Sequence, residues 1–208
     1  MGQRFMRRFV IYDTEYTAWK GSRERNWAEP WEFREILQIA AVKVEVDHGC
    51  ETIASFNEFI KPSINPVLSD YIIELTGITQ DLVDQNGIDL ASAISLFNLF
   101  CEDGGCHTLS WGDDLRVLRD DADAKQIEFP AGLIRHTDLG PVFHAVDGYD
   151  FHVYSGDLHK VLGIPVPGHA HNALHDVHSI AASLDFLVRE KLILPDRLLP
   201  SVSAALPI

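Results

Sequence analysis

Two kinds of hydrophobic pattern follow one another along the chain, and their order limits the folds open to it. Strand-like patterns, either short apolar runs or alternation rich in β-branched residues, occur at residues 9–12, 35–47, 51–61, 107–111 and 133–138. The first three follow directly on one another and are interpreted as an antiparallel meander. Helical spacing then alternates with the last two. This order predicts an α/β fold with a five-stranded mixed sheet flanked by helices.

Apolar residues at helical spacing, several times preceded by a capping residue, predict the helices. They cover residues 69–77, a short segment after Thr79, and residues 89–102, 113–122, 139–146, 155–162 and 172–191. Residues 16–31 are predicted to form an ordered loop, and residues 195–208 have no firm period. The length of 208 residues fits a single domain, 1–208, with a core at 8–188 and a tail at 189–208.

The composition excludes several classes of protein. Apolar residues make up 46% and charged residues 23%, which excludes a largely disordered chain. No apolar run reaches the roughly 18 residues that a membrane span requires, and the run after the basic N-terminus is too short for a signal peptide. Three cysteines are too few for a disulfide framework. We therefore expect a reduced, cytoplasmic protein.

The net charge of −14 is unevenly distributed. Residues 1–34 carry seven Lys or Arg and five acids, so that the rest of the chain has a net charge of −16. A strongly acidic protein is not typical of non-specific duplex binders. A patch that steers phosphate is expected in the first segment, and a solvated charged segment is an equally good interpretation.

Asp13 and Glu15 are two residues apart at the end of the first strand, so both carboxylates lie on one face. Two neighbouring carboxylates repel one another unless a cation lies between them, and oxygen ligands suit Mg²⁺ or Mn²⁺. Many such pairs are only surface charges. A buried strand, however, has no evident structural reason to end in two anions.

Two further segments place polar side chains at strand and helix ends. Asp113 and Asp114 follow the fourth strand, where α/β sheets build sites, and either of them can also simply cap the next helix. His171 and Asp176 lie at the start of the last long helix and can point to the same place. An imidazole there can accept a proton from water at neutral pH, or serve only as part of a histidine-rich cap.

Taken together, these motifs resemble the DEDD superfamily of 3′–5′ exonucleases, in the DEDDh branch whose last motif is H-x-x-x-x-D. Asp13 and Glu15 match the first motif, Asp114 the second, and His171 with Asp176 the third. Residues 35–42 and 75–79 also match family phrases, and the resemblance covers about residues 8–188. Eri-type and sporulation-inhibitor-type exonucleases have the most similar motif sequences. Asp113 competes with Asp114, which we prefer because of the apolar spacing after it.

The resemblance implies a ribonuclease-H-like fold and a metal-dependent 3′–5′ exonuclease that releases nucleoside 5′-monophosphates. Two ions, Mg²⁺ or Mn²⁺, would be held by Asp13, Glu15, Asp114 and Asp176, with His171 as general base. The partners would be 3′ ends of single-stranded RNA or DNA, with RNA slightly favoured and no membrane involved. Thr14, Trp19 and Trp27 are candidate substrate contacts, although the tryptophans fit a small loop core equally well.

Other functions are less well supported by the residues. A DNA proofreading or repair exonuclease and a catalytically inactive nucleic-acid-binding module are the main alternatives. Weak zinc patterns occur at Cys101, Cys106 and His107, and among His169, His171 and His175. His175 with Asp176 also matches the dyad of HD-type phosphohydrolases, but the predicted strands argue against that all-helical fold.

Overall fold

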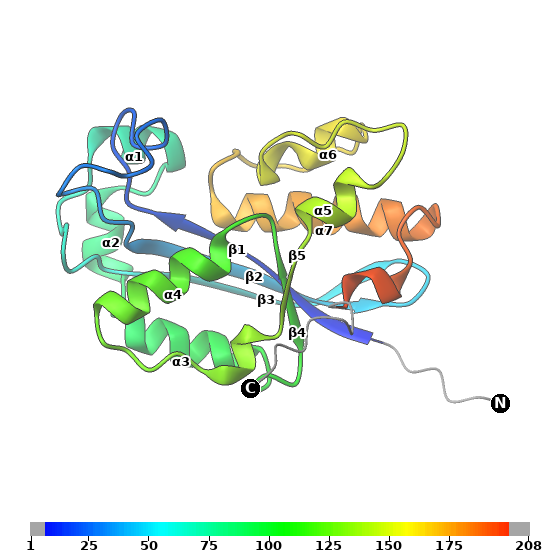
Figure 1. The fold of residues 1–208 in the computed structure, drawn as a ribbon, viewed down its shortest axis with the longest axis horizontal. Helices are drawn as coiled ribbons and strands as arrows, with labels where there is room; N and C mark the ends of the chain where they lie inside the picture. Colours follow the sequence, from blue (N-terminus) through cyan, green and yellow to red (C-terminus); the bar gives the residue numbers. More distant parts are fainter. Residues whose placement is uncertain (1–6, 200–208) are drawn as a thin grey trace.

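A five-stranded mixed sheet runs through the centre of the computed structural model, which describes residues 7–199 (Figure 1). The strands are β1 (Arg7–Tyr16), β2 (Ile36–Val46), β3 (Cys50–Phe59), β4 (His107–Ser110) and β5 (His136–Asp138). They lie in the order β3-β2-β1-β4-β5. The first three pair in antiparallel fashion, and β4 and β5 run parallel to β1. The predicted α/β fold with a mixed sheet is confirmed.

Helices cover both faces of this sheet, with α7, α5 and α6 on one side and α3 and α4 on the other (Figure 1). The helices are α1 (Asp70–Thr76), α2 (Gln80–Asn86), α3 (Leu90–Phe100), α4 (Asp114–Ala124), α5 (Gly140–His144), α6 (Leu158–Val161) and α7 (Ala173–Arg189). Ser69 and Thr79 cap α1 and α2 through their side chains, as the sequence predicts.

Alternate residues of β1 enter different cores, and this alternation positions the polar end of the strand. Phe9 and Ile11 pack in the cluster that contains the apolar face of α7. Val10 and Tyr12 pack in the cluster that contains α3 and α4. With a side-chain period of two, Asp13 and Glu15 continue the row that faces α7, whereas Thr14 continues the row that faces α4.

Two predictions from the sequence are wrong in detail. The predicted strand at 133–138 begins instead as a 3₁₀ turn, Ala131–Ile134, because Leu133 donates its N–H to Pro130 (3.1 Å) and not to β4. The predicted tail is partly core: another 3₁₀ turn, Pro195–Leu198, buries Leu198, and Ile193 packs beside it. A single short turn has too few residues to show a hydrophobic period. Residues 200–208 of the predicted tail lie outside the described residues.

Within residues 7–199, no helix combines the length and the hydropathy that a membrane crossing requires. The three cysteines, Cys50, Cys101 and Cys106, are buried free thiols. Burial raises the pKa of the Cys50 and Cys101 thiols to about 12, so neither is a thiolate at neutral pH.

Candidate active site

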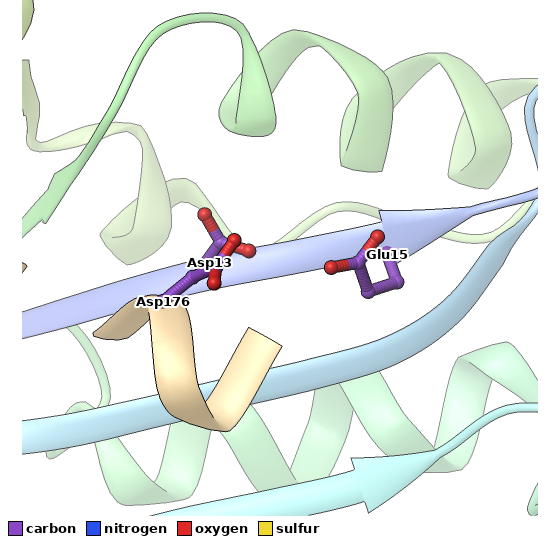
Figure 2. Close-up of side chains that lie close together, drawn as sticks. All are labelled: Asp13, Glu15 and Asp176. Carbon is purple, nitrogen blue, oxygen red and sulfur yellow. The ribbon is translucent and has the colours of Figure 1, made fainter. Parts of the chain in front are cut away.

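Three buried carboxylates converge between β1 and the first turn of α7. One oxygen each from Asp13, Glu15 and Asp176 lies within 4.8 Å of the other two. Figure 2 shows Asp13 and Asp176 pointing toward one another, with Glu15 further along β1. Asp13 is 6%, Glu15 9% and Asp176 3% exposed. Water therefore screens the repulsion among the three negative charges poorly. The convergence predicted from the sequence is present, although the two segments are separated by more than 150 residues.

No Lys or Arg of the described part of the chain pairs with these carboxylates, and their pKa values shift accordingly. Burial, and then the charges of Asp114, Asp176 and Glu15, raise the pKa of Asp13 well above its usual range. Burial and the other carboxylates likewise raise the pKa of Glu15. Burial raises the pKa of Asp176 to about 6, although a hydrogen bond from Ser155 opposes the shift. In addition, Asp176 Oδ1 is buried and has no hydrogen-bond partner among the described residues.

Contacts from two distant segments hold Asp176 in place. The Ser155 hydroxyl donates to Asp176 Oδ2 (3.0 Å). Gly156 lies so close that a Cβ there would be 2.4 Å from Asp176 Oδ1. The N-terminus of α7 is fixed by Gln38 of β2, whose buried side-chain oxygen accepts the N–H of Ala173 (3.1 Å). The carboxylate therefore has little freedom to move away from Asp13.

Asp114 approaches from the other face of β1. Its Oδ1 accepts hydrogen bonds from the Thr14 hydroxyl (2.6 Å) and the Thr14 backbone N–H (3.0 Å). Burial raises the pKa of Asp114 to about 6, while these hydrogen bonds act in the opposite direction. Asp113, by contrast, is exposed, pairs with Arg116, and makes no side-chain cap. The geometry favours Asp114, as the apolar spacing does, but leaves it outside the three-carboxylate group.

His171 lies just before α7 in a left-handed backbone conformation, with φ of 64°. A non-glycine residue is uncommon there and is held by its surroundings. The ring of Tyr154 meets the imidazole edge-on, with the centroids 5.1 Å apart. Burial lowers the pKa of His171, Asp157 raises it, and His169 and Arg23 lower it further. The net shift favours the neutral imidazole, which can accept a proton.

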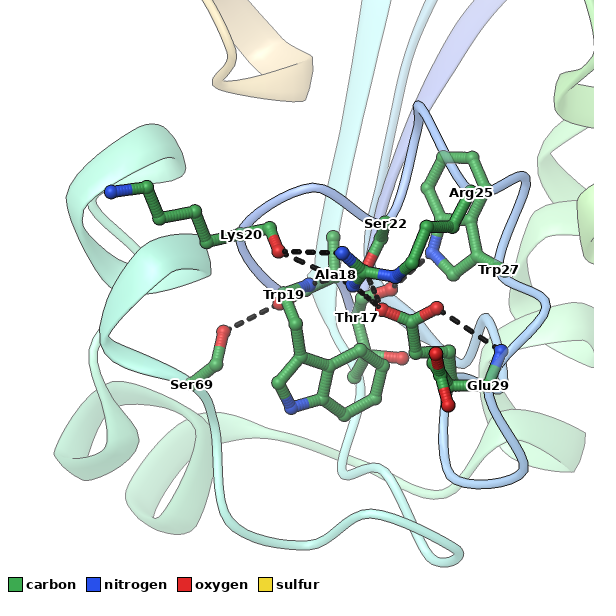
Figure 3. Close-up of polar contacts among 10 residues, drawn as sticks. Thr17, Ala18, Trp19, Lys20, Ser22, Arg25, Trp27, Glu29 and Ser69 are labelled. Carbon is green, nitrogen blue, oxygen red and sulfur yellow. Dashed lines mark hydrogen bonds and ion pairs between the residues drawn. The ribbon is translucent and has the colours of Figure 1, made fainter.

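The loop between β1 and β2 is internally bonded, and its tryptophans differ (Figure 3). Trp27 donates its indole N–H to the Thr17 carbonyl (3.3 Å), and Arg34 lies over its ring at 5.1 Å. These contacts fit the loop core that was the alternative to substrate stacking. Trp19 is half-buried, and its ring is separated from that of Trp27. Stacking on a base stays a prediction for both.

The zinc patterns noted in the sequence do not form sites among residues 7–199. There, the Asp13 group is the only set of three His, Cys, Asp or Glu side chains that meets so closely. His107 Nε2 bonds to the Thr137 hydroxyl instead (2.8 Å). The two ring nitrogens of His175 face the carbonyls of Pro167 (3.1 Å) and Gly156 (3.2 Å).

Several residues around the carboxylates had not been found from the sequence. Gln38, Tyr154, Ser155 and Gly156 each contact the motif residues or the segment that carries them. All come from outside the three motifs, and each acts through a long-range contact. Only the family phrase at residues 35–42, which contains Gln38, gave any signal of this kind.

Comparison with known proteins agrees with the geometry. The family model described as Exonuclease (RNase_T) matches residues 10–184. The 3′–5′ exonuclease Snipper of Drosophila melanogaster is 28% identical over 201 residues, which cover 87% of this chain and 69% of that protein. ERI1 exoribonuclease 2 of Xenopus laevis is also 28% identical, over 86% of this chain but only 28% of its own length.

A solved structure shares the fold. The nuclease domain of 3′hExo, a DEDDh family member bound to rAMP, superposes with a TM-score of 0.71 at 22% identity, over 91% of this chain and 95% of that one. The described sheet and helices thus have the arrangement of a DEDDh exonuclease.

Proposed function

This chain belongs to the Exonuclease (RNase_T) family, and on that premise we propose that it is a metal-dependent 3′–5′ exonuclease acting on single-stranded nucleic acid. It would release nucleoside 5′-monophosphates, with RNA as the favoured strand. The observation that carries the proposal is the meeting of Asp13, Glu15 and Asp176 as buried carboxylates that no Lys or Arg of residues 7–199 neutralises. One domain over residues 1–208 and a reducing, cytoplasmic location, in keeping with buried free thiols, belong to the same proposal.

Divalent cations fit these residues. The donors are carboxylate oxygens, which suit Mg²⁺ or Mn²⁺, and Asp176 Oδ1, which has no hydrogen-bond partner within residues 7–199, is available as a ligand. Asp13, Glu15 and Asp176 would hold such ions, with Asp114 completing the set. When bound, the ions make water more acidic and stabilise charge on the leaving 3′ oxygen.

The chain's own residues orient the reacting groups. His171 is neutral at neutral pH and would accept the proton of the attacking water. The edge of the Tyr154 ring fixes the imidazole plane, and Ser155 fixes the Asp176 carboxylate. The Thr14 hydroxyl and backbone N–H keep Asp114 oriented toward β1.

The preference for RNA is drawn from the relatives. The Xenopus relative is named an exoribonuclease, and the 3′hExo nuclease domain was solved with rAMP. A contact to the 2′-hydroxyl would distinguish RNA from DNA. The activity, substrates and partners of the much longer relatives come to this chain only as part of this proposal.

The test uses matched RNA and DNA oligonucleotides, each blocked at the 3′ or the 5′ end, incubated with the full chain and Mg²⁺. We expect a ladder of shortened products from strands with a free 3′ end, formed faster on RNA, and no ladder with EDTA. Binding without any shortening would support the inactive binding module instead. Faster trimming of DNA would support the repair-type alternative.

A further inference from the structure

Arg23, in the loop between β1 and β2, is connected to the proposed base by two ring contacts. Its guanidinium carbon lies over the ring of Tyr154, 4.9 Å from the centroid. The same ring meets His171 at 5.1 Å. The loop therefore brings a positive charge close to His171, although the two residues are far apart in sequence.

The other arginines of this loop have carboxylate partners. Arg25 forms an ion pair with the buried Glu32, and Arg34 lies 3.7 Å from Asp120. No carboxylate of residues 7–199 pairs with Arg23, and its side chain is exposed. A guanidinium with one face over a ring keeps its N–H groups free at the edge, where two of them can donate to two oxygens of a phosphate.

Backbone hydrogen bonds hold this arginine in position. Arg25 N–H donates to Gly21 (3.1 Å), Asn26 N–H to the carbonyl of Arg23 itself (3.1 Å), and Trp27 N–H to Ser22 (2.8 Å). The Ser22 hydroxyl is bonded in turn to Glu32 (2.7 Å), within the network drawn in Figure 3. A side chain on such a turn loses less conformational freedom when it binds a ligand.

The charge distribution of the protein indicates why a cation near His171 would favour substrate binding. A polyanionic strand approaching the carboxylates meets a protein of net charge −14, although residues 1–34 are net positive. If His171 takes the proton of a water that attacks phosphorus, a phosphate must lie beside its imidazole. The Tyr154 ring places Arg23 next to that position.

We propose that Arg23 binds a phosphate oxygen near the 3′ end of the substrate strand, with the Tyr154 ring as its platform. The proposal rests on the proposed function for the identity of the strand. It assigns the loop between β1 and β2 a role in substrate binding that depends on phosphate and not on base identity.

The test measures equilibrium binding of a short 5′-labelled RNA oligonucleotide by fluorescence anisotropy. All variants are made in a His171→Ala background, so that hydrolysis does not interfere. Arg23→Gln should weaken binding about tenfold, as loss of one hydrogen bond between charged groups does. It should also lower the salt dependence of log affinity by about 0.7, the contribution of one phosphate contact on a single strand.

Three control variants make the result specific. Lys20→Gln removes an equal charge from the same loop and should change affinity by less than about twofold. Arg23→Lys should retain part of the affinity, and Tyr154→Phe, which keeps the ring, should retain nearly all of it. Thermal unfolding is measured for each variant.

Equal affinities for Arg23→Gln and Lys20→Gln, or a loss of stability in Arg23→Gln with unchanged affinity, would overturn the proposal. A separate hydrolysis assay of the wild-type chain distinguishes the two proposals. Binding that depends on Arg23 without any hydrolysis would sink the exonuclease function and leave the phosphate contact standing.

Discussion

Two clusters of buried carboxylates lie near the first half of β2, and only one of them is neutralised by basic side chains of the described residues. Near the start of β2, Glu35 accepts the N–H groups of residues 63–65 and pairs with Lys125 (2.9 Å). Lys125 also lies 2.8 Å from Asp121. Beside β1, the Asp13, Glu15 and Asp176 carboxylates meet, and no Lys or Arg within residues 7–199 pairs with them.

The pKa shifts reflect this difference. Burial alone would raise the pKa of Glu35, but the N–H donors and Lys125 bring it below its usual value. Burial and like charges raise the pKa of Asp13 and Glu15 well above theirs. Ionised Glu35 thus stabilises the fold, although burial still raises the pKa of its neighbour Asp121. The Asp13 cluster, in which the pKa of Asp13 and of Glu15 is raised well above its usual range, opposes folding until a cation arrives. Substitutions in the two clusters should therefore have opposite effects on stability.

The largest effect is expected from Asp13→Asn. Asp13 is one of the carboxylates proposed to hold the cations. Removing its charge should lower the rate of 3′ trimming about 10²–10³-fold, the scale of losing one group that stabilises charge in the transition state. Its unfolding midpoint without metal should be no lower than that of the wild type, because repulsion is relieved. Trimming at the wild-type rate would remove Asp13 from the site.

A matched pair of substitutions compares the clusters directly. Glu35→Gln should lower the free energy of unfolding by about 3 kcal/mol, because Lys125 loses its partner and three N–H bonds weaken. Glu15→Gln, unfolded in the absence of metal, should leave the free energy of unfolding unchanged or raise it. Urea unfolding of both variants measures this, and equal losses would mean that the two clusters do not differ.

A smaller effect is expected from Gly156→Ala. The added Cβ would approach Asp176 Oδ1 to 2.4 Å, so the carboxylate or the loop must shift. Cation affinity should fall about 10–100-fold, as when a group that orients a metal ligand is changed. The Mg²⁺ concentration for half-maximal trimming measures the shift. Ser155→Ala, which removes the hydrogen bond to Asp176 but adds no bulk, should have the weaker effect.

The smallest effect is a pH dependence of stability. The folded-state pKa of Asp176, about 6, lies above the ordinary value near 4. Its protonated form therefore favours folding at low pH, and this contribution is lost as pH rises from about 4 through 6. Without metal, Asp176→Asn should gain about 2 kcal/mol on the wild type between pH 4 and pH 7. If the difference in unfolding free energy between Asp176→Asn and the wild type does not change with pH, the raised pKa of Asp176 is contradicted.

The same two clusters show which parts of the site can be predicted from the sequence and which cannot. Asp13 and Glu15 were found because the two-residue period of a strand places both on one face. The order of strands and helices, with the family resemblance, then brought Asp176 to that face. The partners of Glu35 were not predicted, because backbone N–H groups at residues 63–65 and a lysine on α4 share no local pattern with it. Ser155 and Gln38 were missed for the same reason.

Loop residues show the limit most clearly. Trp27 was a candidate for base stacking, yet its ring is covered by Arg34, whose position depends on the folding of the loop. Arg23 belonged only to a net positive segment until Tyr154 was found beneath it. Composition predicted a positively charged segment, but only the tertiary contact with Tyr154 shows where the Arg23 guanidinium lies.

Isothermal titration calorimetry of Mg²⁺ into the wild-type chain and into Asp176→Asn, at neutral pH and without nucleic acid, tests most directly whether the buried carboxylates hold divalent ions. We expect saturable binding in the wild type and strongly weakened binding in the variant. No binding in either protein, or identical binding in both, would contradict a cation site between β1 and α7.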